Sequence, residues 1–245
     1  NPEHPEVMWQ LSEAIDGMTD GCLAMGLPVI GGNVSLYNES RGVDIDPTPV
    51  IGLLGLVDSL ERRPPGTTLV EGHRLVLLGD DLGSPAPSLA GSTAAWGSGQ
   101  KGGVLPELDW PTHTRVANFV RDRVSAGGLS GVHDVSTGGL ATALGEMAVR
   151  SGVGVDVAGV PTAAHALGEG PSRVVAAVAP DDVDGLLADA RGAGLAAVEL
   201  GTAGGDRFVI RTGGDSPLVD LSLTEVVDAW RNRLPTALGE GVTQG

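Results

Sequence analysis

The stretch Leu129-Ser130-Gly131-Val132-His133-Asp134-Val135-Ser136-Thr137-Gly138-Gly139-Leu140 does most to decide the fold class. Its first seven residues predict a strand, and a helix is expected from about Thr137 to Arg150. Ser136 is a plausible N-cap for this helix, because its side chain can accept a hydrogen bond from the first turn. The stretch therefore predicts a strand that leads directly into a helix.

Strands and helices are expected on both sides of this stretch. The expected strands are 28–30, 48–57, 74–78, 129–135, 153–157, 173–178, 195–200 and 207–211, and the expected helices are 5–25, 89–96, 111–124, 137–150, 180–191 and 222–234. They follow one another without strict alternation, which favours an α+β or layered α/β fold over a doubly wound sheet. A charged stretch ending in Pro-Pro-Gly makes Ser59 to Gly72 the best candidate for a linker.

Composition narrows the classes of function. The 245 residues include 15 basic and 31 acidic ones, a formal net charge of −16. Without a Lys/Arg cluster the chain lacks the basic face that nucleic acids or anionic membranes require. A phosphate ligand remains compatible, because helix N-termini and a bound divalent cation can hold it.

The single cysteine and the N-terminal residues bear on the cellular compartment and on where the sequence begins. Cys22 is the only cysteine, so an internal disulfide is ruled out and a reducing cytoplasm fits. No apolar run reaches the length of about 18 residues that a transmembrane helix needs. The start at Asn1 lacks an initiator Met and a signal peptide, so we expect the sequence to begin inside a longer polypeptide.

The strongest local motif is Gly31-Gly32-Asn33-Val34-Ser35-Leu36-Tyr37-Asn38-Glu39. Paired glycines after a strand let the backbone approach a ligand closely. In an extended segment Asn33 and Ser35 point the same way. The Asn33 oxygen could then complete a Mg²⁺ shell shared with phosphate, and the Ser35 hydroxyl could bind phosphate or a substrate hydroxyl. A simple Gly-Gly-Asn turn with a local cap is the alternative.

A second motif lies between Gly131 and Leu140. Asp134 ends a strand just before a glycine-opened helix, so a carboxylate that attracts a cation stands beside a helix N-terminus that attracts an anion. Together they would suit a metal–phosphate pair. Alternatively, Asp134 and Ser136 simply cap the helix while His133 packs beside the strand.

The sequence does not present a complete set of catalytic residues. His4, His73, His113 and His165 are scattered without ligand spacing. Nucleophile-elbow, Walker-type and zinc-protease motifs are missing from the sequence. No catalytic residue is therefore assigned within this chain.

Read together, the motifs resemble the phosphoribosylformylglycinamidine (FGAM) synthase family. The matching strings, in order, are Asn1 to Leu11, Gly26 to Glu39, Pro47 to Gly52, Leu89 to Ser92 and His133 to Leu140. The similarity runs over essentially the whole chain, and the first two strings are the most specific. Two positions depart from the family pattern: Thr137, where Asp is frequent, and Ser92 to Trp96, where a tyrosine is more usual.

The resemblance implies a fold and a reaction. It implies that residues 1–62 are the end of a second A-type subdomain and residues 63–245 a complete second B-type subdomain. The implied enzyme is a carbon–nitrogen ligase of purine biosynthesis that uses ATP, Mg²⁺ and glutamine-derived ammonia. ATP phosphorylates the amide oxygen of formylglycinamide ribonucleotide, and ammonia displaces phosphate from the resulting iminophosphate to give FGAM.

The same resemblance implies roles for four residues. Gly32 would contact ATP, Asn33 would bind Mg²⁺ and Ser35 would contact the ribonucleotide. Asp134 would be a metal ligand of an auxiliary nucleotide site, or only structural. The family's catalytic histidine and most of its metal carboxylates lie upstream, so this chain alone is expected to be inactive.

Partners and alternatives follow from the resemblance as well. Expected partners are the N-terminal remainder of the polypeptide, a glutamine amidotransferase subunit and a small bridging subunit. The alternatives are a related ATP-dependent enzyme, of the selenophosphate synthetase, aminoimidazole ribonucleotide synthetase or thiamine monophosphate kinase type, or a non-catalytic structural half.

Overall fold

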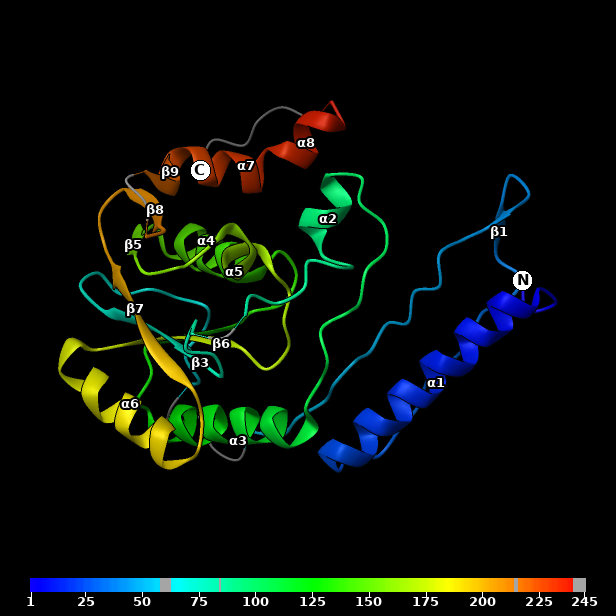
Figure 1. The fold of residues 1–245 in the computed structure, drawn as a ribbon, viewed down its shortest axis with the longest axis horizontal. Helices are drawn as coiled ribbons and strands as arrows, with labels where there is room; N and C mark the ends of the chain where they lie inside the picture. The colour runs from blue at the N-terminus through cyan, green and yellow to red at the C-terminus, as the bar shows by residue number, and fades with distance from the viewer. Residues whose placement is uncertain (58–62, 84, 214–215, 240–245) are drawn as a thin grey trace. The chain divides into compact units, whose positions relative to one another are not determined.

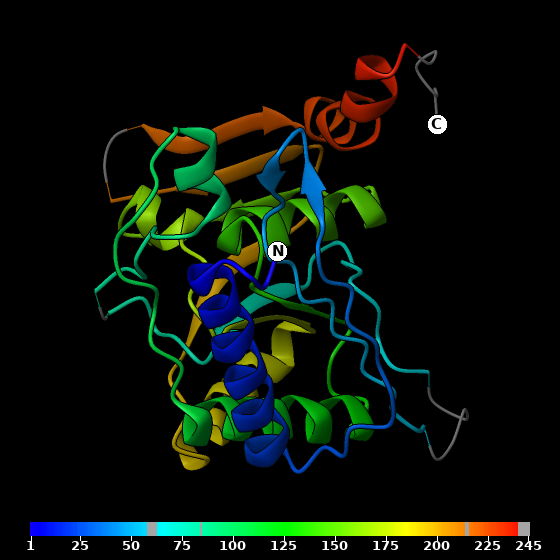
Figure 2. The ribbon, with the colours of Figure 1, turned by 90° about the vertical axis from the view of Figure 1, so that its right-hand side faces the viewer.

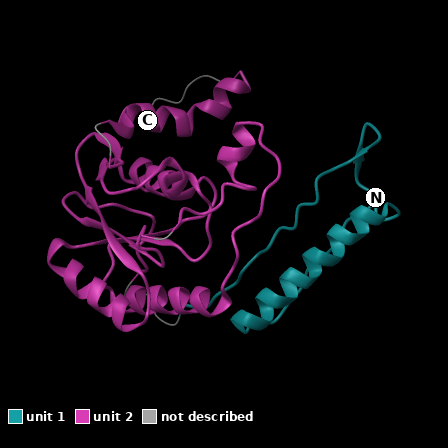
Figure 3. Cartoon of the chain, viewed as in Figure 1, with its two compact units in different colours: residues 1–60 teal, residues 61–245 magenta. Residues whose placement is uncertain are grey.

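The computed structural model describes residues 1–57, 63–83, 85–213 and 216–239. The chain divides into two compact units, unit 1 (Asn1–Leu60) and unit 2 (Glu61–Gly245) (Figure 3). Each unit is described by itself below.

Unit 1 begins with the long helix α1 (Pro5–Met25), as the apolar periodicity predicts. Pro5 occupies the first turn, where the fixed φ of proline suits a helix and its missing N–H is not needed. Gly26 ends the helix in the left-handed conformation, with φ of 64°. The other regular elements described in unit 1 are the short antiparallel strands β1 (Glu39–Ser40) and β2 (Val43–Asp44).

The remainder of unit 1 corrects two expectations. Residues 28–30 and 48–57 were expected to be strands, but the described residues of both segments have no ladder partner and no regular secondary structure. Their apolar side chains are open to solvent: Ile30 is 82% and Leu56 93% exposed. A strand is completed by hydrogen bonds to a neighbouring strand, and an apolar run supplies composition but not that neighbour.

Unit 2 is built on a seven-stranded mixed sheet with the order β4-β6-β3-β7-β5-β8-β9 (Figure 1). The strands are β3 (Arg74–Leu78), β4 (Gly131–Asp134), β5 (Val155–Val157), β6 (Val174–Val178), β7 (Ala197–Ala203), β8 (Arg207–Arg211) and β9 (Pro217–Ser222). Neighbouring strands are antiparallel except β5 and β8, which are parallel.

Helices cover both faces of this sheet (Figures 1 and 2). One face carries α3 (Trp110–Ala126) and α6 (Val183–Gly192), and the other carries α4 (Gly139–Ser151), α5 (Ala163–Leu167) and α7 (Leu223–Arg231). Alternate residues of the central strand β3 enter different cores: Leu75 and Leu77 join the α4 side, Val76 and Leu78 the α3 side. The expected layered α/β fold is therefore confirmed.

Several local predictions hold and others shift. Ser222 and Glu225 form the predicted capping box at the start of α7. The N-cap of α4, however, is Gly138 rather than Ser136, because two consecutive glycines with φ of 77° and 71° delay the helix. Helix α5 and strand β9 were not predicted. The short elements α2 (Thr93–Gly97), η1 (Pro180–Asp182) and α8 (Arg233–Ala237) complete the unit.

The described part of the expected linker packs onto unit 2. Gly66 accepts a hydrogen bond from the Val132 amide at 3.1 Å, and the Thr68 hydroxyl donates to the Ser130 carbonyl at 3.2 Å. Residues 66–68 thus lie along the outer edge of β4, which shields its unpaired backbone groups. Residues 58–62 of the expected linker lie outside the described residues.

Candidate functional site

The Gly31–Glu39 loop is an open segment of unit 1 that leads into β1. Residues 31–38 have no regular secondary structure, and all of them are exposed. A Cβ placed on Gly31 or Gly32 would meet no atom within 4 Å. The backbone at these two glycines is therefore open to a ligand. Tyr37 adopts a left-handed conformation with φ of 61° and turns the chain into the hairpin.

The side-chain amides of Asn33 and Asn38, both in this loop, differ in their hydrogen bonds. The Asn38 side-chain nitrogen donates to the Ser35 carbonyl at 3.1 Å and lies 3.4 Å from the Ser35 hydroxyl. Asn33, in contrast, has no hydrogen-bond partner for its side chain among the described residues. The Asn33 oxygen is therefore available to a cation or another ligand.

A polar cluster ties the hairpin after the loop to the start of α1. Asp44 accepts from the Asn1 amino group at 2.8 Å and contacts His4 Nδ1 at 2.7 Å, and the Asn1 amide donates to Glu39 at 3.3 Å. The hydrogen bond with Asp44 raises the pKa of His4. Sequence reasoning missed this contact, because nothing local pairs residues 4 and 44.

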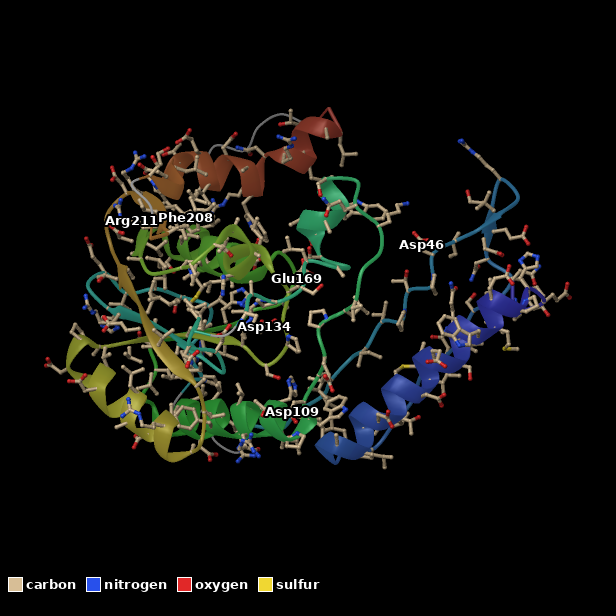
Figure 4. All side chains as sticks on the ribbon, in the orientation of Figure 1. Asp46, Asp109, Asp134, Glu169, Phe208 and Arg211 are labelled. Atoms are coloured by element: carbon tan, nitrogen blue, oxygen red, sulfur yellow. The ribbon has the colours of Figure 1, made fainter. Side chains whose placement is uncertain are left out.

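In unit 2, Asp134 lies at the end of β4 with 72% of its side chain exposed (Figure 4). The neighbouring His133 is largely buried: its Nε2 lies 3.1 Å from a Glu146 oxygen and its Nδ1 2.8 Å from the Asp134 carbonyl. His133 therefore packs beside the strand, as one of the two sequence interpretations expects, but neither Asp134 nor Ser136 caps α4, as that interpretation also expected, because its N-cap is Gly138.

The anion position at the glycine turn before α4 is filled by Glu169, a residue that the sequence did not point to. One Glu169 oxygen accepts from the Gly138 amide and from the Thr93 amide, each at 2.7 Å. Burial acts to raise the pKa of Glu169, but the hydrogen bonds from Thr93 and Gly138 outweigh it, so the pKa lies below its usual value. A phosphate at this turn would have to displace Glu169 from Gly138.

The predicted ligand residues belong to two different units. Gly32, Asn33 and Ser35 lie in unit 1, and Asp134 lies in unit 2. The described residues contain no group of three or more His, Cys, Asp or Glu side chains that could hold a metal ion. Nor does any described helix have the length and apolarity to cross a membrane. The roles of these four residues stay predictions.

Family models match both parts of the chain. Residues 70–212 match the AIR synthase related protein, C-terminal domain, and residues 1–57 match the AIR synthase related protein, N-terminal domain. Together the matches cover most of unit 2 and nearly all of unit 1.

The chain is similar in sequence to curated PurL subunits of phosphoribosylformylglycinamidine synthase. A phosphoribosylformylglycinamidine synthase subunit PurL from Nocardioides sp. is 41% identical over 244 residues, which is 98% of this chain and 31% of that protein. The PurL subunit from Moorella thermoacetica is 38% identical over 97% of this chain and 32% of its own length. The chain thus spans about a third of the length of the curated relatives that it matches.

Solved structures agree at the level of the fold. Thermotoga maritima PurL complexed with FGAR matches 66% of this chain and 29% of that chain, with a TM-score of 0.56 and 16% identity. Phosphoribosylformylglycinamidine synthase II from the same organism gives a TM-score of 0.54 at 15% identity, over 66% of this chain and 27% of its own.

Proposed function

The chain belongs to the AIR synthase related family, and from this premise we propose that it is part of an FGAM synthase, the ATP-dependent ligase that makes FGAM in purine biosynthesis. The observation that carries the proposal is 41% identity to a PurL subunit over 98% of the chain. Because the chain spans about a third of such a subunit, the activity belongs to the longer protein, and this chain supplies a portion of it.

We assign the two ends of the chain to two subdomains of that enzyme. Residues 1–62 form the end of the second A-type subdomain, and residues 63–245 form the second B-type subdomain. The separation into units at residues 60 and 61 and the two family matches support this division.

The Gly31–Glu39 loop contributes to the ATP side of the reaction. Gly32, which has open space around its backbone, lies against ATP. The unpartnered oxygen of Asn33 is a Mg²⁺ ligand, and Ser35, held by Asn38, contacts the ribonucleotide. A neutral amide oxygen combined with phosphate oxygens and water is a donor set that Mg²⁺ accepts. When bound, Mg²⁺ neutralises charge on the phosphates, and the loop holds the reactants in place.

The remaining assignments concern the ammonia source and the assembly. The proposed enzyme is a carbon–nitrogen ligase with glutamine as amido-nitrogen donor, so its ammonia comes from an amidotransferase subunit, joined through a small bridging subunit. The N-terminal remainder of the polypeptide supplies the catalytic histidine and the other metal carboxylates. A cytoplasmic location accompanies this pathway.

Asp134 is assigned separately as a metal ligand of an auxiliary nucleotide site. Its exposure leaves it open to a cation. The contact between Glu169 and Gly138 competes with a phosphate at the same turn, so nucleotide binding there requires that contact to break.

The test uses the full-length subunit that contains this chain, assayed with formylglycinamide ribonucleotide, ATP and ammonia. We expect Asn33→Ala to lower kcat/KM by about tenfold to a hundredfold and to shift the Mg²⁺ titration of activity to higher concentration, since one metal ligand is lost.

The matched control is Asn38→Ala, which removes an amide from the same loop that donates to Ser35. It should leave the Mg²⁺ titration in place. An unchanged Mg²⁺ titration in Asn33→Ala would refute the metal role, and a full-length protein with no activity on formylglycinamide ribonucleotide would refute the proposed reaction.

A further inference from the structure

Asn38 makes side-chain hydrogen bonds inside the Gly31–Glu39 loop, and both reach the same residue. Its amide nitrogen donates to the Ser35 carbonyl at 3.1 Å and to the Ser35 hydroxyl oxygen at 3.4 Å. Residues 31–37 are exposed and lack regular secondary structure, so neither burial nor a strand ladder fixes Ser35. The conformation of Ser35 therefore depends on Asn38.

Tyr37 is the residue that returns the chain toward Ser35. Its φ of 61° lies in the left-handed region, which residues other than glycine seldom occupy. Such a conformation costs free energy and persists where surrounding contacts compensate for it. The hydrogen bonds from Asn38 to Ser35 span this turn, so they are contacts of that kind.

Asn38 is itself fixed by the hairpin that follows it. Its carbonyl accepts from the Ile45 amide at 3.3 Å, which continues the register of the β1–β2 ladder by one pair. Asp44 in β2 lies 2.7 Å from Nδ1 of His4, the residue that precedes α1. A line of contacts thus runs within unit 1 from the start of α1 through the hairpin to Asn38 and Ser35.

The Asn38 amide also decides what the Ser35 hydroxyl can do. A carbonyl only accepts, so the group of Asn38 that faces the Ser35 carbonyl is the nitrogen and not the oxygen. That nitrogen only donates, so the Ser35 hydroxyl oxygen is the acceptor in the second contact. The hydroxyl hydrogen goes to no acceptor among the described residues, which leaves it for a ligand.

We infer that Asn38 is a positioning residue that presents the Ser35 hydroxyl as a hydrogen-bond donor to an accepting oxygen of the ribonucleotide. The inference rests on the proposed function, in which Ser35 contacts this substrate, and adds the residue that orients Ser35 and the direction of the bond. Asn38 acts through Ser35 and does not touch the substrate. A preset hydroxyl lowers the entropic cost of binding, so Asn38 contributes to substrate affinity and not to the chemical step.

A double-mutant cycle in the full-length subunit tests this inference. Ser35→Ala, Asn38→Ala and the combined variant are assayed with ammonia at saturating ATP and Mg²⁺, and the ribonucleotide concentration is varied. We expect Ser35→Ala to raise the KM for formylglycinamide ribonucleotide about tenfold and Asn38→Ala about fivefold, with kcat within about twofold of wild type. The combined variant should match Ser35→Ala, because no hydroxyl is left for Asn38 to orient.

The matched control is Asn118→Ala, which removes an exposed amide from α3 in unit 2 that has no side-chain hydrogen bond among the described residues. It should leave the KM for the ribonucleotide unchanged. Losses that add in the combined variant, or a fall in kcat with Asn38→Ala, would mean that Asn38 supports the whole loop, and either result would overturn the inference.

The cycle also separates this inference from the proposed function. An unchanged KM in Asn38→Ala beside a raised KM in Ser35→Ala would overturn the positioning role of Asn38 and leave the proposed function standing. An unchanged KM in both single variants would overturn the substrate contact of Ser35 and, with it, the inference.

Discussion

Gly139 and Gly152 stand at the two ends of α4 in nearly the same left-handed conformation, with φ of 71° and 66°. A Cβ on Gly139 would lie 2.7 Å from the Leu167 carbonyl carbon and 2.8 Å from the Ala166 carbonyl oxygen. A Cβ on Gly152 would meet nothing within 4 Å. The pair therefore separates the cost of backbone strain from the cost of a steric clash.

We expect Gly152→Ala to lower the free energy of unfolding by about 1 kcal/mol, the strain of a left-handed alanine. Gly139→Ala should lower it by about 3 kcal/mol or more, because strain and overpacking add. Urea denaturation followed by circular dichroism measures both. Equal losses in the two variants would mean that α5 can move away from the α4 start at little cost.

The Glu169 carboxylate gives a pH-dependent contribution to stability. Its pKa is lowered in the folded state, so the stabilisation is present above the unfolded pKa of about 4.3 and is lost as pH falls through the lower folded value. We expect Glu169→Gln to cost about 1 kcal/mol near pH 7, since a charged acceptor of two amides becomes neutral. The difference from wild type should shrink in acid.

Denaturation midpoints between neutral and acid pH check this expectation. Glu13→Gln is the matched control, because Glu13 is exposed on α1 and has no hydrogen-bond partner among the described residues. It should follow wild type at every pH. A constant gap between wild type and Glu169→Gln would rule out ionisation as the source of the effect.

At the scale of elements, sequence patterns succeeded where the partner of an element lies within the same unit. The apolar run at 74–78 became β3 because β6 and β7 pair with it on both sides. The equally apolar run at 48–57 did not become a strand, since no neighbour pairs with its described residues. Helix α1 was predictable without a partner because its backbone hydrogen bonds are internal.

In the candidate site, too, local features were predictable from the sequence and long-range contacts were not. The Gly31–Glu39 loop was identified from a local motif, and its position before β1 and its exposure are now described. The bond between Glu169 and Gly138 spans 31 residues and that between Glu169 and Thr93 spans 76, so spacing alone could not reveal either. Long-range contacts of this kind depend on the packed fold.

The apolar segment 50–57 carries a prediction about association. Side chains on both of its faces are open, among them Val50 at 86%, Ile51 at 68% and Leu54 at 78% exposure. Such a segment is a template for pairing with another strand. We expect the chain by itself to self-associate as concentration rises, as seen by size-exclusion chromatography with light scattering.

The double variant Ile51→Lys, Leu54→Lys should suppress this association by placing charges on the segment. Val104→Lys is the control, because Val104 is 82% exposed in unit 2 and lies outside the segment. If the chain stays monomeric at all concentrations, or if Val104→Lys suppresses association instead, then the segment 50–57 is not the surface through which the chain self-associates.

At the scale of the whole molecule, the two units differ in how they are stabilised. Every buried core residue among the described ones lies in unit 2, from Leu69 to Ile210. Residues 1–57 contain none that is buried, so unit 1 has helix and hairpin hydrogen bonds and the exposed contact of His4 with Asp44, but no apolar core of its own. Burial of apolar surface is the main source of cooperative stability, so unit 2 should fold cooperatively and unit 1 should not.

Limited proteolysis of the chain tests this difference. Chymotrypsin should first cleave within unit 1, where Leu53, Leu54 and Leu56 are 76%, 78% and 93% exposed, and leave unit 2 as a resistant fragment. The purified fragment should unfold in one cooperative transition within a few degrees of the main transition of the full chain, because its cores are intact. Simultaneous digestion of both units, or a fragment that has lost that transition, would mean that unit 2 draws stability from unit 1.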